Sequence, residues 1–280
     1  MEDLKNRLIL YGKNGWKFPE NIDGDSLADE IVEALASTDS ALRDGLALSA
    51  FDPLVMSGKV SFDKCRHLLK HLLSEKCILN GLGKECDDTV FGRAFYPYAI
   101  GTLLVYDEEN EYGIFSKEDV KSAYDTCCNV FIKERDLRDF VDIKGWAHAT
   151  SHMADFLCGY DDRITNRKQR LTILDAIKNK ILVNYHYFKT DEGKRLGSTI
   201  IGIIGDHDLT EQEFENWVAS FFEYDKIGDF AKDDCVLHNR RFFFSQLKYE
   251  LGDNFKENYP HLLPYIENAF EKANREWIEN

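Results

Sequence analysis

The sequence predicts an all-α protein, and three observations support this fold class. Apolar residues recur with the 3.6-residue period of a helix along most of the chain. Strand signals are scarce, because alternating runs of Val, Ile, Thr and Tyr between tight turns hardly occur. Hydroxyl, amide or carboxylate residues stand before several apolar stripes, where they are suited to cap helix N-termini.

Five apolar stripes define one set of predicted helices. These stripes run through residues 62–73, 120–132, 171–182, 214–222 and 262–273. Capping and N-terminal signals place their starts near Ser61, Ser116, Asn166 or Thr165, Thr210 and Pro260. A second set of helices is expected to begin near Asp39, Asp88, Ile143, Asp191 and Asp233, mostly at acidic residues that suit a helix N-terminus. Pro97 either kinks the helix predicted over 90–105 or delays its start.

The two sets alternate along the chain. Starts of the first set lie about 45 to 55 residues apart, which matches a helix–loop–helix unit. Because one helix pair cannot bury its apolar face alone, we expect an α-solenoid of antiparallel helix pairs, like HEAT or armadillo repeats. The alternative is an irregular, compact helical bundle. We expect a single all-helical domain over 1–280, with an N-terminal helical cap at 1–36 and stacked pairs at 37–280.

The charge of the chain excludes some partners. The 280 residues include 35 Lys and Arg and 50 Asp and Glu, which gives a net charge of −15. This field repels phosphate, so we expect neither nucleic-acid nor anionic-membrane binding. No apolar stretch approaches the roughly 20 residues of a membrane span, and the N-terminus shows no signal peptide. The 7 cysteines follow no metal-ribbon spacing, which favours reduced thiols and a cytoplasmic protein.

The most unusual local sequence is residues 134–155. A helix predicted over 145–157 places His148, His152 and Asp155 on one face at spacings of four and three residues. Two imidazoles and a carboxylate are suited to bind Zn²⁺ or Fe²⁺, or to transfer protons. The outer two residues lie about 10.5 Å apart along a helix, which disfavours a shared metal. An ordinary amphipathic helix shows the same pattern, so a purely structural role is the alternative.

Other polar residues allow weaker interpretations. His67 and His71 also stand four residues apart, and we interpret them as a solvated helix face. Arg93 stands among four aromatic residues between 91 and 98, so it either packs on their rings or reaches into a groove toward an anion. The charged residues of 134–139 are expected to form a salt-bridged turn.

Residues 134–155 resemble the signature of an uncharacterised bacterial family, domain of unknown function 2785. The signature has an acidic–Asp–x–Arg–(Gly)–Phe turn, here Glu134–Phe140, with Asp139 where the pattern has a glycine. A Gly–Trp–Ala–His–Ala helix follows, here Gly145–Ala149, with a second His and an Asp. Residues 90–95 resemble a second, weaker block, and we expect the similarity to begin near residue 40.

The resemblance implies an all-helical, cytoplasmic protein, and it supplies no activity, substrate or cofactor. It also implies that the recognisable core of the family forms one site: Arg93, Asp136, Arg138, His148, His152 and Asp155.

These observations favour a binding or scaffold protein, whose concave groove takes a peptide, a partner protein or a small ligand. The alternative is a metal-dependent hydrolase that uses His148, His152 and Asp155, with a divalent metal as its cofactor. The sequence does not decide whether the protein is an enzyme. The candidate ligand-binding residues are Arg93, Asp136, Arg138, Trp146, His148, Ser151, His152 and Asp155.

Overall fold

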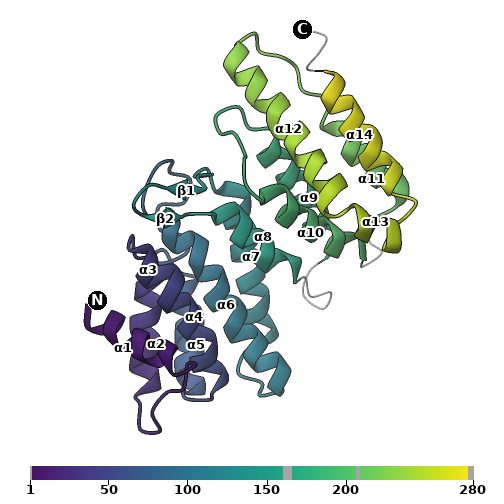
Figure 1. Cartoon of the computed structure of the whole chain (residues 1–280). Helices are drawn as coiled ribbons and strands as arrows, with labels where there is room; N and C mark the ends of the chain where they lie inside the picture. The colour runs from purple at the N-terminus through teal and green to yellow at the C-terminus, as the bar shows by residue number, and fades with distance from the viewer. Residues whose placement is uncertain (1, 160–165, 206–208, 277–280) are drawn as a thin grey trace. The chain divides into compact units, whose positions relative to one another are not determined.

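The computed structural model describes residues 2–159, 166–205 and 209–276, and it divides into two compact units. Unit 1 is Met1–Phe156 and unit 2 is Leu157–Asn280. Helices dominate both units (Figure 1), and the described ranges contain one sheet, of two short strands. The predicted all-α class is therefore confirmed, whereas the single domain over 1–280 stays a prediction.

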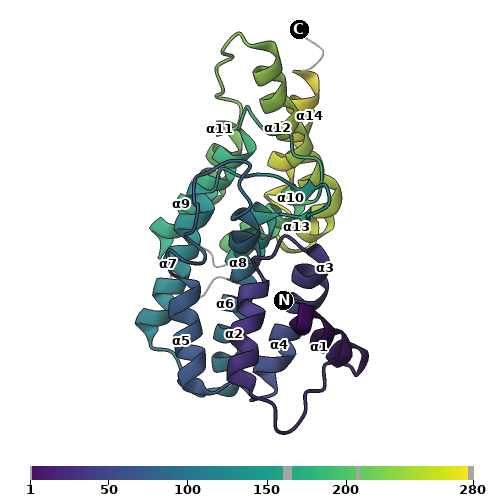
Figure 2. The ribbon, with the colours of Figure 1, turned by 90° about the vertical axis from the view of Figure 1, so that its left-hand side faces the viewer.

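Unit 1 is built around the long helix α6, which packs against α4, α5 and α7 (Figure 2). Helix α4 also packs against α2. Apolar side chains of α6, among them Phe91, Phe95 and Ile100, are fully or almost fully buried in this core. The helices of the unit are α1 (Glu2–Lys13), α2 (Gly24–Ala34), α3 (Ser40–Leu42), the π-helix η1 (Arg43–Ala47), α4 (Leu48–Met56), α5 (Phe62–Leu72), α6 (Val90–Asn110), α7 (Lys117–Lys133) and most of α8 (Ala149–Cys158).

Local capping chemistry explains several helix starts in unit 1. Ser61 accepts a hydrogen bond from the backbone N–H of Lys64 at the start of α5. Ser116 and Asp119 form a capping box at the start of α7, as predicted. The Asp39 side chain caps α3 by accepting a hydrogen bond from the backbone N–H of Leu42. Pro97 lies inside α6, so it does not delay the start of that helix.

Unit 2 is organised around α12, which packs against α9, α10, α13 and α14 (Figure 1). Its helices are α9 (Arg167–Ile181), α10 (Glu192–Gly205), α11 (Glu211–Ser220), α12 (Phe230–Glu250), α13 (Gly252–Asn258) and α14 (Leu263–Arg275). Thr210 forms a capping box at α11, as predicted, and Asn166 forms one at α9, where a helix start was expected at Asn166 or at Thr165, which lies outside the described residues. Helix α12 begins earlier than expected, behind its N-cap Asp229.

The Asp233 carboxylate, where we expected that start, instead accepts bonds from the N–H groups of Ile227 and Gly228 and from the Tyr224 hydroxyl. It therefore holds the loop before α12. The last helix begins at Leu263 rather than near Pro260.

The helix predicted over 145–157 is wrong at its start. Strands β1 (Phe140–Val141) and β2 (Gly145–Trp146) pair antiparallel, with Phe140 opposite Trp146. Helix α8 begins only at Ala149. Ile143, Gly145 and His148 have φ angles of +67°, +77° and +52°, which a right-handed helix cannot include. The expected helix start at Ile143 is wrong for the same reason.

Candidate functional site

A β-hairpin at residues 138–148, called the hairpin below, leads directly into α8. Two backbone bonds extend its ladder beyond the strands. The N–H of Ala147 donates to the carbonyl of Asp139 at 2.7 Å, and the N–H of His148 donates to the carbonyl of Arg138 at 3.2 Å. The His148 carbonyl in turn accepts the N–H of His152 at 3.0 Å. His148 therefore ends the hairpin and begins the first turn of α8.

The guanidinium of Arg43 anchors the far strand of the hairpin. Arg43 comes from the π-helix η1 and is fully buried. Its Nη2 donates to the carbonyls of Lys144 at 2.9 Å and Trp146 at 3.0 Å. Burial lowers the pKa of Arg43, because charging a group away from water is costly. The hairpin carbonyls offset part of that cost, so core and hairpin stabilise each other.

Gly145 allows the hairpin to approach Arg43 closely. Its φ of +77° is a conformation that side-chain-bearing residues rarely adopt. A Cβ atom at this position would lie 2.5 Å from the Cβ of Ser40 and 3.3 Å from Nη2 of Arg43. The glycine of the Gly–Trp–Ala–His–Ala sequence therefore serves a tight approach to α3 and η1, not a helix.

The hairpin exposes three large apolar side chains. Phe140, Ile143 and Trp146 are 58%, 90% and 41% exposed. The rings of Phe140 and Trp146 make an edge contact with centroids 5.2 Å apart. Ile143 is β-branched and has a φ of +67°, which strains the backbone of this residue. The hairpin thus combines a firmly held backbone with an apolar, solvent-facing surface.

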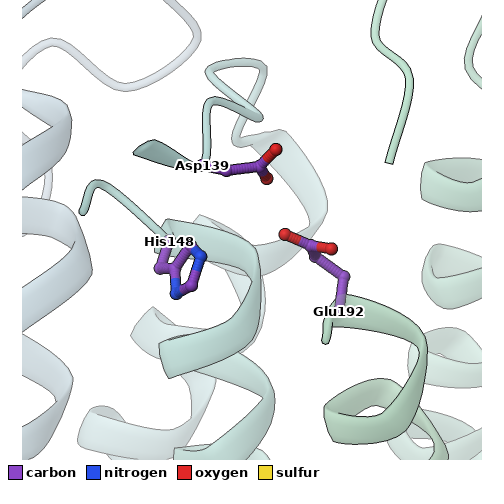
Figure 3. Close-up of side chains that lie close together, drawn as sticks. All are labelled: Asp139, His148 and Glu192. Carbon is purple, nitrogen blue, oxygen red and sulfur yellow. The ribbon is translucent and has the colours of Figure 1, made fainter. Parts of the chain in front are cut away.

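The carboxylate of Asp139 lies close to His148. Asp139 is 3% exposed, and one of its carboxylate oxygens lies within 4.8 Å of a ring nitrogen of His148. Figure 3 shows Asp139 where the hairpin begins and His148 where the chain enters α8. The ring of Trp146 lies 4.4 Å from that of His148, between centroids. Sequence reasoning assigned Asp139 only to a salt-bridged turn, because nothing local indicates that the hairpin brings it to His148.

The third side chain drawn in Figure 3, Glu192, belongs to unit 2 and begins α10. Its carboxylate accepts hydrogen bonds from the backbone N–H of Thr190 at 3.2 Å and from the Thr190 hydroxyl at 2.5 Å. Within unit 2 it therefore stabilises the start of α10.

His152 is held in one orientation by the core of unit 1. Its Nδ1 lies 3.1 Å from the carbonyl oxygen of Ala94, and edge contacts join its ring to Phe95 and Tyr98. A carbonyl can only accept, so Nδ1 carries the proton and Nε2 carries the lone pair of the neutral ring. The ring centroids of His148 and His152 are 5.8 Å apart. The structure therefore brings together the two histidines that the sequence indicated.

Asp155 contacts helix α6 through Tyr98. Its Oδ2 accepts a hydrogen bond from the Tyr98 hydroxyl at 3.0 Å. In the part of the chain that the structure describes, neither Asp155 nor Asp139 forms, together with His148 and His152, a group whose ligand atoms all lie within 4.8 Å of one another. The neighbouring candidate Ser151 is fully buried, and its hydroxyl has no hydrogen-bond partner among the described residues.

Arg93 is buried in the core rather than exposed to a groove, which corrects the sequence-based expectation. Its Nε and Nη2 donate to the carboxylate of Glu134. Its Nη1 donates to the carbonyl of Asn80 at 2.6 Å and to the hydroxyl of Thr89 at 2.7 Å. Four of its five N–H donors are thus used inside unit 1, so Arg93 braces the chain after α7.

Asp136 and Arg138 brace the same segment. Asp136 is almost fully buried and accepts hydrogen bonds from Nε and Nη2 of Arg138 at 2.8 and 2.7 Å. It also accepts the backbone N–H of Asp87 at 3.2 Å. Hydrogen bonding to Asp136 raises the pKa of Arg138. These two residues form the salt-bridged turn that the sequence predicts, and they support the hairpin from the side of β1.

The fold and this geometry define an all-helical protein with a histidine- and aspartate-bearing hairpin inserted between two helices. The chain belongs to the family described as Protein of unknown function (DUF2785), whose family model matches residues 78–248. The resemblance inferred from residues 134–155 is therefore confirmed, although the match begins at residue 78 rather than near residue 40. None of the curated proteins and none of the solved structures matches this chain.

In the described ranges, no helix is both long enough and apolar enough to cross a bilayer.

Proposed function

We propose that this protein is a binding protein whose hairpin contacts a polypeptide ligand. The observation that carries the proposal is the combination of exposed Phe140, Ile143 and Trp146 with a hairpin backbone tied to a buried arginine. Aromatic side chains on a firm support are typical of protein–protein contacts, because little conformational entropy is lost when they are covered.

The strain at Ile143 supports the same proposal. A β-branched residue at a φ of +67° costs about 1 to 3 kcal/mol, and an exposed turn has no need of its side chain for folding. An asparagine or a glycine fits this backbone better. A solvent-facing isoleucine is therefore better explained by a contact that covers it.

The polar side chains behind the hairpin give the ligand its hydrogen-bonding partners. We propose that Trp146 and His148 contact the ligand directly, since the Trp146 ring lies against the half-exposed His148. His152 supports His148 from the next turn of α8. Arg93, Asp136 and Arg138 then act indirectly, because their bonds hold the segment that carries the hairpin.

We also propose HEAT-type stacking of helix pairs, a cytoplasmic location and a ligand that is not polyanionic. The packing of α2 on α4, of α4 on α6 and of α6 on α7 supports stacked helix pairs of the HEAT type within unit 1. All seven cysteines are free thiols, which supports a reducing, cytoplasmic setting. The net charge of −15 supports a ligand that is neither a nucleic acid nor an anionic membrane.

Selection of peptides from a displayed random library on the immobilised full chain tests the polypeptide contact. We expect enriched peptides to bind about tenfold or more weakly to a Phe140→Ser/Ile143→Ser variant. A Phe230→Ser variant is the matched control, because Phe230 is also a highly exposed aromatic residue but lies in unit 2. Failure to enrich any peptide, or equal affinity for all three proteins, contradicts the proposal.

The alternative function, a metal-dependent hydrolase, depends on His148, His152 and Asp155 acting together. Asp155 accepts a hydrogen bond from Tyr98, whereas an oxygen of Asp139 lies within 4.8 Å of a ring nitrogen of His148. We therefore retain only the metal-binding part of that alternative, with a different carboxylate.

A further inference from the structure

We propose that Asp139, His148 and His152 form a binding site for one divalent transition-metal ion within unit 1. This inference goes beyond the polypeptide contact and does not depend on it. The site combines one residue from the start of the hairpin, one from its end and one from the first turns of α8.

The two imidazoles have nearly the spacing that a shared metal requires. Zinc–nitrogen bonds of about 2.0 to 2.1 Å at tetrahedral angles place two imidazole centroids about 5.3 Å apart. The centroids of His148 and His152 are 5.8 Å apart. The bond from the His152 N–H to the His148 carbonyl keeps the two residues in register. The ligand atoms of Asp139, His148 and His152 do not all lie within 4.8 Å of one another, so binding requires the side chains of Asp139 and His148 to rotate toward the fixed ring of His152.

His152 already has the support that metal-bound histidines need. A ligating imidazole usually donates its other N–H to a backbone carbonyl or a carboxylate, which fixes the tautomer and the ring orientation. Here Nδ1 donates to the carbonyl of Ala94 at 3.1 Å. Nε2 is therefore the nitrogen with the lone pair, and it is the ligand atom that we assign.

Asp139 supplies the negative charge. Ligand atoms on a tetrahedral zinc lie about 3.3 Å apart, and an Asp139 oxygen lies within 4.8 Å of a His148 nitrogen. The backbone of Asp139 is held by the bond from Ala147, so only its side chain has to adjust. Two neutral imidazoles and one carboxylate suit Zn²⁺ or Fe²⁺ and leave a position for water or a further ligand.

The chain contains its own control for unspecific binding. His67 and His71 have the same spacing of four residues, lie on α5 and are both exposed. A histidine pair at this spacing that binds metal by itself is expected to do so on α5 as well. The proposed site differs from it through the buried carboxylate and the oriented second imidazole.

The test is calorimetric titration of Zn²⁺ into chelator-treated full-length protein, with the visible spectrum of bound Co²⁺ as a second readout. We expect one ion per chain. Asp139→Asn should weaken the affinity by about tenfold or more, and His148→Gln/His152→Gln should abolish binding. Asp155→Asn and His67→Ala/His71→Ala should bind as the unmodified chain does. Circular dichroism of each variant shows whether it is folded.

Three results would overturn the site. The Asp139→Asn and His148→Gln/His152→Gln variants could bind Zn²⁺ as tightly as the unmodified chain. Binding could be lost on changing His67 and His71. Asp155→Asn could weaken binding while Asp139→Asn does not, which would return the carboxylate role to Asp155. The Phe140→Ser/Ile143→Ser variant should keep its Zn²⁺ affinity, so failure of the peptide contact and failure of the metal site are distinguishable.

Discussion

Two fully buried arginines hold the two ends of the segment that carries the hairpin, and different groups compensate their charges. Arg93 holds the segment at Glu134, with a two-point contact to a carboxylate that is itself buried. Arg43 holds it at Lys144 and Trp146 through their carbonyl oxygens. Its only carboxylate contact in the described residues is the adjacent Asp44, whose side chain is 29% exposed.

The environment of Arg43 is completed by the faces of two aromatic rings. Its guanidinium carbon lies 4.2 Å from the centroid of Phe91 and 4.9 Å from that of Phe95. Such cation–π contacts and carbonyl bonds stabilise a cation without a full counter-charge. The comparison teaches that the charge of Arg93 is compensated by the buried carboxylate of Glu134, whereas the charge of Arg43 depends on hairpin carbonyls and therefore on the hairpin remaining in place.

Breaking the Arg93 pair should give the largest effect. Arg93→Met leaves the Glu134 carboxylate buried without its partner, so we expect a loss of about 3 to 5 kcal/mol in the free energy of unfolding, measured by urea denaturation. An Arg93→Met/Glu134→Met double variant should recover most of this loss. A double variant whose loss equals the sum of the two single losses would show that the residues do not act as a pair.

Removing the other cation should destabilise less and more locally. Arg43→Met eliminates the bonds to the Lys144 and Trp146 carbonyls, and we expect a loss of about 2 to 3 kcal/mol. Hydrogen exchange should become faster at the backbone N–H groups of Ala147 and His148, which close the hairpin. The comparison fails if exchange at these two groups is unchanged while the whole unit loses stability.

Adding a methyl group at Gly145 tests the close approach to Arg43. Gly145→Ala places a Cβ 2.5 Å from the Cβ of Ser40 at a positive φ, and we expect about 1 to 3 kcal/mol of destabilisation by thermal or urea unfolding. Ser40→Gly in the same chain should relieve the contact but not the strain of the φ angle. An unchanged stability for Gly145→Ala would show that the hairpin is not held close to α3.

Acid should weaken the Arg93 end of the segment through Asp87. Hydrogen bonds from the Thr89 hydroxyl and N–H lower the pKa of Asp87 to about 2. Because this pKa is lowered in the folded state, the stabilisation is present above the ordinary value of about 3.9 and is lost as the pH falls toward 2. The difference in melting temperature between the unmodified chain and Asp87→Asn should therefore shrink as the pH is lowered from about 5 to about 4 and about 3. Parallel curves would contradict this assignment.

The smallest expected change separates stability from function at the hairpin tip. Ile143→Asn should raise the free energy of unfolding by about 0.5 to 1 kcal/mol, because asparagine tolerates a positive φ better. The same variant should lose affinity for the selected peptides. A more stable variant with full peptide binding would mean that the strain serves no contact.

Several helix starts in this chain were predictable from local sequence. Ser61, Ser116, Asn166 and Thr210 cap helices where the sequence places them, because a cap joins a side chain to a backbone group only two or three residues away. The Asp136–Arg138 bridge is equally local, and it too was predictable.

The site itself required the tertiary structure. His67/His71 and His148/His152 have identical spacing, yet only the second pair lies beside a buried carboxylate and a core carbonyl. The helix predicted over residues 145–157 placed Asp155 on the same face as the two histidines. The hairpin instead reverses the chain and brings Asp139 close to His148. That reversal depends on Arg43, about a hundred residues earlier in the chain, and on the space beside Ser40 that only a glycine fits. Caps and apolar stripes depend on residues that are neighbours in sequence. A contact over about a hundred residues depends on the packing of the whole unit, because the arginine can be buried only where its hydrogen bonds are made.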